Sequence, residues 1–531
     1  MYLKIYIRPK RKNVYIITIP FYKMKKWVKV GLLCAIILVN ILLAYQPHFN
    51  YPYPILTDEY NHIAFAKYIV NEHKLPFTNP YLAYPEKVIN FESGFHFFLA
   101  ATFLVIPEEP VLYYKYFIIL FMILNSLLLF YLVMLWFKNY YTALLSVLFY
   151  GTIKSTGDLL VHNYFLPLTI GITLLLLSFI FFYKWEHEKT NKPFNKYLSY
   201  LAVTLIITAL VYPPTLTFFA GILFLYILFM PHNIHEKFNL KKRHFFAYFA
   251  LISAIIIIIS LILMTYLNLT KFIIFPDTWT PIQAKYSPIF FFGIISSIFA
   301  FFGLISTLKE NKNKAILFWF IFSLIQIYLY YIFKFNILVP FARLFTFYLI
   351  GLSILAGIGV IYITKLTIEY LGKTKNFNNI KYVKIIVIII ILALISINYY
   401  SIIKNPLNPP HIINEKNYEI INVLKQNNPA QTIIIANGLI SSAIYPTTGA
   451  KVIGIIGANL GGGFPEKSND FIYGSCKDKE KGITTIKETL IWLNDKKIKQ
   501  VILVSNFQQN CPFLESIYEK NIYLYKINLT N

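Results

Sequence analysis

Two adjacent acids near the start of the chain, followed by a histidine, are the residues whose types and spacing could do chemistry. The stretch "TDEYNHIAFAKYIV", residues 57–70, contains Asp58, Glu59 and His62. On a helix, the four-residue spacing puts Asp58 and His62 on one side and turns Glu59 away by roughly 100°. A carboxylate held in this way could accept a proton from an attacking hydroxyl group, which is general-base chemistry. The structural alternative is helix capping, with Thr57 or Asp58 as the N-cap residue of a short surface helix.

The composition indicates that these residues belong to a membrane protein. Of 531 residues, 57% are hydrophobic and 14% are charged. Apolar runs of about 17 to 25 residues recur, and each is long enough to cross about 30 Å of hydrocarbon as a helix. We therefore expect a membrane all-α fold over residues 27–400, a polytopic bundle of about 11 transmembrane helices, followed by a small extracytoplasmic α/β domain. The expected helices span residues 27–45, 111–137, 140–153, 160–183, 197–212, 214–230, 245–267, 288–308, 315–333, 338–364 and 383–400, and the run at 93–106 is ambiguous.

The positive charge sets the expected topology. The net charge is +25, but the lysines and arginines lie in short clusters between apolar runs, so the positive-inside rule explains them better than a nucleic-acid partner does. In a multi-pass protein of the plasma membrane, we expect the basic segment 1–26 in the cytoplasm, and the first outer loop 46–92 and the domain 401–531 outside. Consistent sidedness leaves two solutions. Either 93–106 lies in the outer interface and 140–153 crosses, or the reverse holds.

The tail that follows the Pro-rich stretch "NPLNPPH" alternates between strand and helix patterns, which predicts a small α/β sheet. We expect strands at 430–437, 451–457, 498–506 and 521–529, and helices within 438–450, at 484–497 and at 511–520. Two of the three cysteines, Cys476 and Cys511, lie in this domain. They could form a disulfide if the domain faces outside, although their spacing alone does not establish it.

The first outer loop is more elaborate than a connector between two crossings needs to be. It is punctuated by prolines and ends in "FESGFHFF", with Glu92 and His96 at the start of the next apolar run. An acidic pair directly after the first crossing, followed by such a loop, resembles the first outer loop of membrane glycosyltransferases of the C superfamily. The resemblance covers the helical region and is strongest to the protein-mannosyltransferase and aminoarabinose-transferase type and to archaeal relatives. Two elements depart from the pattern, because "FESGFH" replaces the prolines of a Pro-Pro-Gly-Phe-His run and "VYPPTLTFF" has Tyr212 in place of a histidine.

The resemblance implies an inverting transfer of a sugar from a polyprenyl or dolichyl phosphate to an acceptor on the outer face of the membrane. It gives Asp58 the role of catalytic base, with Glu59 as the second candidate. His62, His96 and Tyr212 are expected to bind substrate.

Asp158 in "KSTGDLLVHNY" matches a second acid of the superfamily by its position, so we expect it to bind substrate. Its structural alternative is to cap the helix that begins near residue 159. Some relatives bind a divalent metal between the outer loops, and Asp58, Asp158 and His162 could supply hard ligands for one. Because "TDEY" is not an Asp-x-Asp motif, we expect no resident cofactor and keep this metal site as the alternative.

The departing lipid phosphate needs a fixed cation at the outer boundary of the membrane. Arg343 in "VPFARLFTFYLI" is the only arginine after Arg243 and begins an otherwise uncharged helix. We expect it to hold the donor phosphate, and contact with lipid head groups is its alternative. The loop 268–287 contains Lys285, which we expect to bind the sugar unless the loop is only an interfacial anchor.

These expectations combine into an integral membrane glycosyltransferase, a hexosyl- or pentosyltransferase. Its partners would be a polyprenyl-phosphate-sugar donor and a glycan, lipid or protein acceptor of the cell envelope, with no nucleic acid. A transporter or flippase of lipid-linked glycans is the first alternative, and it would place ionisable groups near the middle of the membrane. A non-catalytic membrane scaffold or sensor is the second, and it predicts that Asp58→Asn is silent.

Overall fold

The structure is a computed structural model of the chain. It describes residues 4–6, 16–18, 25–83, 90, 92–155, 159, 162–188, 196–229, 274–276, 287–310, 314–337, 339–373, 393, 396–397, 400, 411–426, 432–436, 438–453, 500–505, 508, 514–519 and 523–527.

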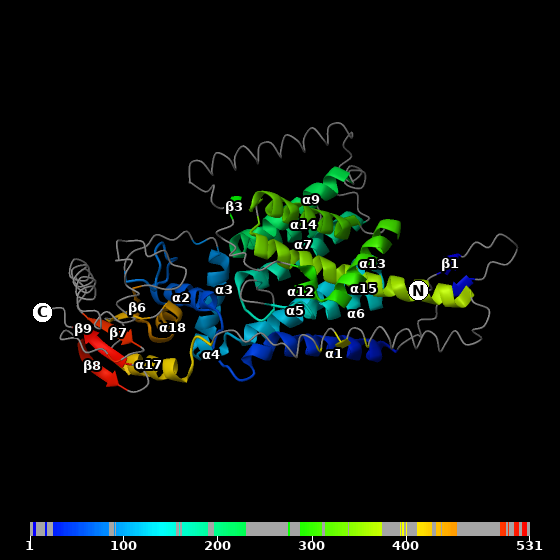
Figure 1. The fold of residues 1–531 in the computed structure, drawn as a ribbon. Helices are drawn as coiled ribbons and strands as arrows, with labels where there is room; N and C mark the ends of the chain where they lie inside the picture. The colour runs from blue at the N-terminus through cyan, green and yellow to red at the C-terminus, as the bar shows by residue number, and fades with distance from the viewer. Residues whose placement is uncertain are drawn as a thin grey trace, which may run out of the picture.

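A bundle of apolar helices forms the larger part of the described chain (Figure 1). Its helices are α1 (Lys26–Tyr45), α5 (Tyr116–Phe137), α6 (Tyr140–Gly151), α7 (Pro167–His187), α8 (Lys196–Val211), α9 (Pro213–Phe229), α12 (Pro288–Phe292), α13 (Ile294–Glu310), α14 (Lys314–Phe333) and α15 (Phe341–Lys373). Five described segments are long and apolar enough to cross a membrane: Lys26–His48, Tyr116–Phe137, Pro167–His187, Lys314–Phe333 and Phe341–Tyr370.

These segments confirm a helical fold of membrane type, but they do not confirm the predicted count of about 11 crossings. The expected helix at 245–267 lies outside the described residues, as does most of the one at 383–400. The expected helix at 111–137 is divided in the structure into a short helix, α4 (Pro110–Tyr113), and the longer α5.

The boundary between α5 and α6 follows from local chemistry. Lys138 ends α5 in the left-handed conformation, with φ 51°. Asn139 then caps α6, because its side-chain oxygen accepts hydrogen bonds from the backbone N–H groups of Tyr141 (2.9 Å) and Thr142 (3.2 Å). The predicted break between two helices at this point is therefore confirmed.

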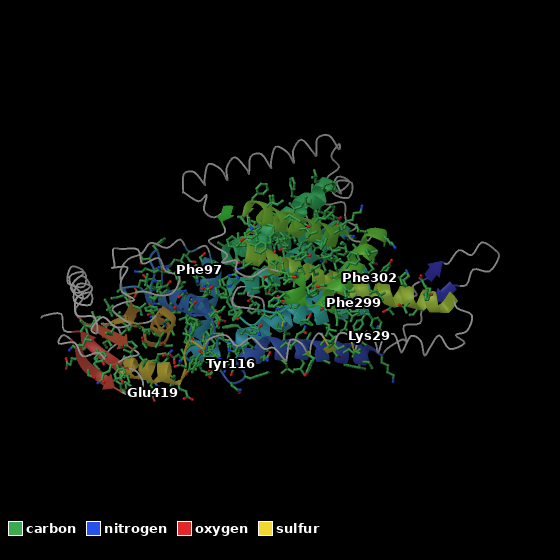
Figure 2. All side chains as sticks on the ribbon, in the orientation of Figure 1. Lys29, Phe97, Tyr116, Phe299, Phe302 and Glu419 are labelled. Atoms are coloured by element: carbon green, nitrogen blue, oxygen red, sulfur yellow. The ribbon has the colours of Figure 1, made fainter. Side chains whose placement is uncertain are left out.

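Glycines bring α13 and α15 into close contact. A Cβ atom at Gly303 would collide with the carbonyl of Leu355, and one at Gly359 would collide with the carbonyl of Phe299, a residue labelled within the bundle in Figure 2. Close packing of small residues is the main source of helix association where lipid surrounds the helices. These contacts hold α15, the helix that carries Arg343.

A smaller unit lies at one end of the bundle (Figure 1). It contains a five-stranded sheet of order β6-β5-β7-β9-β8 with two helices, α17 (Glu415–Gln426) and α18 (Gly438–Thr448). The strands are β5 (Ile433–Ile435), β6 (Lys451–Val452), β7 (Val501–Ser505), β8 (Leu514–Glu519) and β9 (Tyr523–Ile527). The pairs β5–β6 and β5–β7 are parallel, and β7–β9 and β8–β9 are antiparallel. The predicted α/β sheet is confirmed.

The prediction of a helix at 511–520 is wrong, because residues Leu514–Glu519 form the edge strand β8. The segment "LESIYE" is short, contains β-branched and aromatic residues, and pairs with β9 from Leu514↔Ile527 to Glu519↔Tyr523. Pairing with an existing strand therefore outweighs a weak local helix pattern. The predicted helix at 484–497 and the cysteines Cys476 and Cys511 lie outside the described residues.

Two further helices, α2 (Thr57–Glu72) and α3 (Ser93–Val105), lie between the sheet and the bundle (Figure 1). Helix α2 packs against both α3 and α18. Its residues Tyr60 and Ile63 are buried in the core of the bundle, whereas Ala64 and Phe65 are buried in the core of the sheet. The helix that begins with the acidic pair therefore joins the two parts of the molecule.

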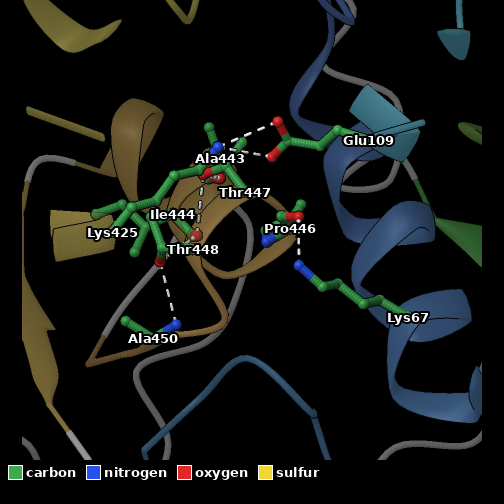
Figure 3. Close-up of polar contacts among 9 residues, drawn as sticks. All are labelled: Lys67, Glu109, Lys425, Ala443, Ile444, Pro446, Thr447, Thr448 and Ala450. Atoms are coloured by element: carbon green, nitrogen blue, oxygen red, sulfur yellow. Dashed lines mark hydrogen bonds and ion pairs between the residues drawn. The ribbon is translucent and has the colours of Figure 1, made fainter. Parts of the chain in front are cut away.

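Ionic and polar contacts support the same junction (Figure 3). The Lys67 ammonium on α2 donates a hydrogen bond to the carbonyl of Pro446 on α18 (3.1 Å). The Lys425 ammonium on α17 lies 2.9 Å from a carboxylate oxygen of Glu109. Glu419, also on α17, is labelled beside the sheet in Figure 2, and Lys29 is labelled on α1.

Candidate active site

Glu59 fixes the start of α2. Its Oε2 atom accepts hydrogen bonds from the backbone N–H groups of Ile55 (2.8 Å) and Leu56 (3.0 Å), and its Oε1 atom accepts one from Phe165 (3.0 Å). The side chain is fully buried. Burial raises the pKa of Glu59 to about 7, although the three N–H donors act in the opposite direction. Both oxygens are thus committed to the backbone, and they tie α2 to the segment before α7.

Asp58 lies in the first turn of α2 and is exposed. The N-cap residue is Leu56, which has an extended conformation. The alternative that Thr57 or Asp58 caps the helix is therefore wrong. The backbone N–H of Leu56 is instead satisfied by Glu59, three residues later. Asp58 is left with its carboxylate in an accessible position beside the other polar residues of the site.

His62 and His96 lie in contact. The Nδ1 atom of His62 is 2.9 Å from the Nε2 atom of His96, and the Nδ1 atom of His96 is 3.0 Å from the side-chain oxygen of Asn90. Glu92 completes the group, with its Oε2 atom 3.9 Å from the Nε2 atom of His62. Helix α2 supplies His62, whereas Glu92 and His96 come from the start of α3.

The protonation of this group follows from its surroundings. Burial, reinforced by the positive charge of Arg343, lowers the pKa of His62 to about 3, so this imidazole is neutral at physiological pH. Burial raises the pKa of Glu92 to about 7. The Arg343 charge works against that rise, and the Asp58 charge adds to it. Asp58 and Arg343 are therefore close enough to Glu92 to affect its ionisation.

Arg343 and Tyr212 add a cation and a hydroxyl to the same place. The Arg343 guanidinium donates a hydrogen bond to the Tyr212 hydroxyl. Arg343 lies in the first turn of α15, where its backbone N–H donates to the carbonyl of Pro340 (3.0 Å). Tyr212 follows α8 directly and precedes Pro213, which opens α9. Helix ends that are far apart in the sequence therefore place both residues.

The structure brings together five of the residues that the sequence singled out: Asp58, His62, His96, Tyr212 and Arg343. Asp158 and Lys285 lie outside the described residues. Of the expected metal site, Asp58 and His162 are described, and the His162 ring donates from Nε2 to the carbonyl of Tyr150 (2.7 Å). That nitrogen is occupied at the end of α6.

Glu92 and Asn90 belong to the site but were not assigned to it from the sequence. The signal that could have found them is the spacing in "NFESGFH", which puts Glu92 and His96 four residues apart at a helix start, on one face. Among the described residues, the group whose atoms could hold a metal ion is His62, Glu92 and His96. It differs from the set of Asp58, Asp158 and His162 that the sequence suggested, of which Asp158 lies outside the described residues.

The apolar helices, the polar group at their end and the attached sheet form a fold of membrane type that is similar to the fold of two known proteins. The archaeal oligosaccharyltransferase AglB from Archaeoglobus fulgidus, in complex with an inhibitory peptide and a dolichol-phosphate, superposes with a TM-score of 0.59 at 12% identity, over 91% of this chain and 70% of that one. The oligosaccharyltransferase from Archaeoglobus fulgidus tethered with an acceptor peptide gives a TM-score of 0.58 at 12% identity, over 90% of this chain and 69% of that one.

ArnT from Cupriavidus metallidurans in the apo state gives a TM-score of 0.54 at 9% identity and covers 95% of this chain and 99% of its own. No protein family and no curated protein matches the sequence. The resemblance that the first outer loop suggested is confirmed at the level of the fold.

Proposed function

We propose that this protein is a glycosyltransferase that moves a sugar from a polyprenyl or dolichyl phosphate to a hydroxyl or amide acceptor on the outer face of the membrane. The observation that carries the proposal is the position of Arg343 and Tyr212 beside Asp58, His62 and Glu92. When a neutral nucleophile displaces a phosphate, a carboxylate is needed to accept the nucleophile's proton, and a cation is needed to stabilise the departing phosphate.

The proposed reaction is a single inverting displacement. Asp58 accepts the proton of the acceptor as the acceptor oxygen or nitrogen bonds to the anomeric carbon. The bond between that carbon and the phosphate oxygen breaks, and the electron pair leaves with the lipid phosphate. Arg343 and Tyr212 donate hydrogen bonds to the departing phosphate, which gains negative charge in the transition state.

Glu59 acts in this proposal as a positioning residue. Its three backbone hydrogen bonds fix the first turn of α2, and that turn determines the direction of the Asp58 carboxylate. The fold supports the choice of substrate class, since the AglB structure holds a dolichol-phosphate and an inhibitory peptide. Outer-face location follows from the expected topology of the basic loops.

The test is transfer by the purified full chain, reconstituted in lipid with a radiolabelled polyprenyl-phosphate hexose and a membrane extract as the source of acceptor. Asp58→Asn should reduce the transfer rate by a factor on the order of 10² to 10⁴, the usual contribution of a general base. The matched control is Glu72→Gln at the other end of α2, where the carboxylate is 50% exposed and faces Lys74. Full transfer by Asp58→Asn would refute the assignment of the base.

A further inference from the structure

Two imidazoles and a carboxylate converge at the site, and the proposed transfer gives them no chemical step. One ligand atom from each of His62, Glu92 and His96 lies within 4.8 Å of the other two. We propose that these three side chains bind one divalent transition-metal ion of the zinc class. The inference concerns the site of the proposed function but does not depend on transfer, because metal binding is measured without turnover.

The distances suit such an ion after small side-chain movements. Ligands bound tetrahedrally at about 2.0–2.1 Å from zinc lie roughly 3.4 Å from one another. Nδ1 of His62 lies 2.9 Å from Nε2 of His96, whereas the 3.9 Å contact with Glu92 is made by the other nitrogen of His62, Nε2. When each residue supplies one ligand atom, the three atoms lie within 4.8 Å of one another, so the side chains must move closer to the ion by small rotations. Three protein ligands leave a fourth position open to water or to another ligand.

The chemistry of the donors selects the metal. Two imidazole nitrogens and one carboxylate suit zinc, cobalt, nickel or iron, whereas magnesium and calcium prefer oxygen ligands alone. The ion therefore differs from the one expected at Asp58, Asp158 and His162, where carboxylates would dominate.

Asn90 sets the orientation of one ligand. Its side-chain oxygen is 3.0 Å from Nδ1 of His96, and an amide oxygen there can only accept, so the proton of this ring lies on Nδ1. The lone pair is then on Nε2, the atom that faces His62. Neutral histidine ligands of metals are commonly held in this way by a second hydrogen bond.

Aromatic rings hold both imidazoles in place. The Phe65 ring stacks on His96 with centroids 4.9 Å apart, and the Phe95 ring meets His62 edge-on at 5.0 Å. Phe65 and Phe95 are buried. Because α2 supplies Phe65 and His62, and α3 supplies Phe95 and His96, packing of the two helices assembles the ligands before any ion arrives.

Charge also bears on the affinity. Asp58 and Glu92 bring negative charge to the site, and Arg343 brings one positive charge that repels a cation. Removal of this repulsion in Arg343→Gln should tighten metal binding severalfold, whereas a ligand substitution should weaken it. A nonspecific surface cation would show neither response.

The experiment uses the full chain in detergent, stripped with a chelator and titrated with Co²⁺, whose visible absorption reports four- or five-coordinate sites. We expect one Co²⁺ per chain, displaced by Zn²⁺. His96→Ala and Glu92→Gln should weaken binding at least a hundredfold, and Asn90→Ala by roughly 10- to 100-fold. The thermal unfolding midpoint of each metal-free variant checks that it folds, and Glu92→Gln keeps the shape of the side chain.

The matched control is His187→Ala at the end of α7. Its ring lies 3.6 Å from Glu186, but within the described chain this pair does not belong to a three-ligand group, so its loss should leave Co²⁺ binding unchanged. Equal binding by wild type and His96→Ala, or no stoichiometric uptake by wild type, would overturn the proposed metal site. Transfer that persists in chelated protein would leave the proposed function intact, so the two failures can be told apart.

Discussion

Leu82, in the segment between α2 and α3, pairs with Val452 in β6, so the segment that leads to the site forms an extra edge of the C-terminal sheet. Two hydrogen bonds make the pairing, from the Val452 N–H to the Tyr81 carbonyl (2.8 Å) and from the Ala83 N–H to the Val452 carbonyl (2.8 Å). Edge pairing of this kind uses main-chain groups and holds an extended segment in place. The sheet therefore restrains one end of the segment that leads to Asn90 and Glu92.

Val452→Pro should release this part of the loop. Proline cannot donate to the Tyr81 carbonyl, while the neighbouring bond from the Ile453 N–H to the Ile434 carbonyl (3.1 Å) can persist within the sheet. With roughly 1 kcal/mol for each lost hydrogen bond, exchange of the Ala83 amide in deuterated buffer should accelerate about fivefold to tenfold. Val452→Ala keeps the N–H and is the control for lost packing. Equal exchange in both variants would show that packing alone holds the loop.

Glu59 should be far less tolerant of alanine than of glutamine. Alanine leaves three backbone N–H groups without their acceptor, at a cost of about 1–3 kcal/mol for each buried group. Glutamine keeps one acceptor oxygen and the volume of the side chain. We expect Glu59→Ala to lower the thermal unfolding midpoint by several degrees more than Glu59→Gln. A larger loss of transfer than of stability in Glu59→Gln would instead indicate a catalytic role.

Ionisation of Glu59 should make stability depend on pH. Burial raises its pKa in the folded chain from 4.5 to about 7, so the folded chain retains the proton more tightly. The contribution of Glu59 protonation to the free energy of unfolding is fully present below about pH 4.5. It is lost as the pH rises through about 7, and the loss amounts to about 3 kcal/mol. Glu59→Gln cannot titrate, so the unfolding midpoint of the wild type should fall relative to the variant over this range.

Other titratable groups that face Glu59 could also change the pH dependence of the unfolding midpoint. They are Tyr51, Asp58, Tyr60, Tyr114 and Tyr164. Burial raises the pKa of each tyrosine well above 7, so none of them ionises in the range. An Asp58→Asn background removes the carboxylate whose charge acts on Glu59. If the unfolding midpoints of Asp58→Asn with and without Glu59→Gln differed by the same amount at every pH, the raised pKa of Glu59 would be contradicted.

Much of the architecture could be predicted from apolar length and charge alone. Uncharged runs such as Tyr116–Phe137 have few structural alternatives to a helix, because a backbone in lipid must satisfy its own hydrogen bonds. The strand Leu514–Glu519 could not be predicted, since its partner Tyr523–Ile527 supplies the edge that stabilises it. Local pattern therefore sufficed where the environment was uniform and failed where a neighbouring strand determined the outcome.

The site was predictable in its residue types but not in its roles. Asp58 and Glu59 are adjacent and identical in charge character, and only the fold shows that the backbone of Phe165 engages one of them. The proximity of Arg343 to His62 depends on helix ends 281 positions apart, and no sequence periodicity reports it. Glu92 lay in the noted motif, yet its partner His62 is on another helix.

Arg343 should affect the lipid donor and not the acceptor. A guanidinium offers two parallel donors to a phosphate, and a hydrogen bond to a charged group contributes about 1.5–3 kcal/mol. We therefore expect Arg343→Gln to reduce kcat/KM for the polyprenyl-phosphate sugar by a factor of roughly 10 to 100, with the KM of the acceptor unchanged. Arg343→Lys should recover part of the loss, because it restores the charge without the planar fork.

The control for this measurement is Lys74→Gln, which removes a cation that is 61% exposed and pairs with Glu72 just after α2. It changes the net charge by the same amount as Arg343→Gln, so any effect of overall charge on donor binding would appear in both. Tyr212→Phe completes the comparison, since it removes the hydroxyl that accepts from Arg343 but leaves the ring packed. If Arg343→Gln raised the KM of donor and acceptor equally, the arginine would be a general structural element of the site, because only a phosphate-binding group can separate the two substrates.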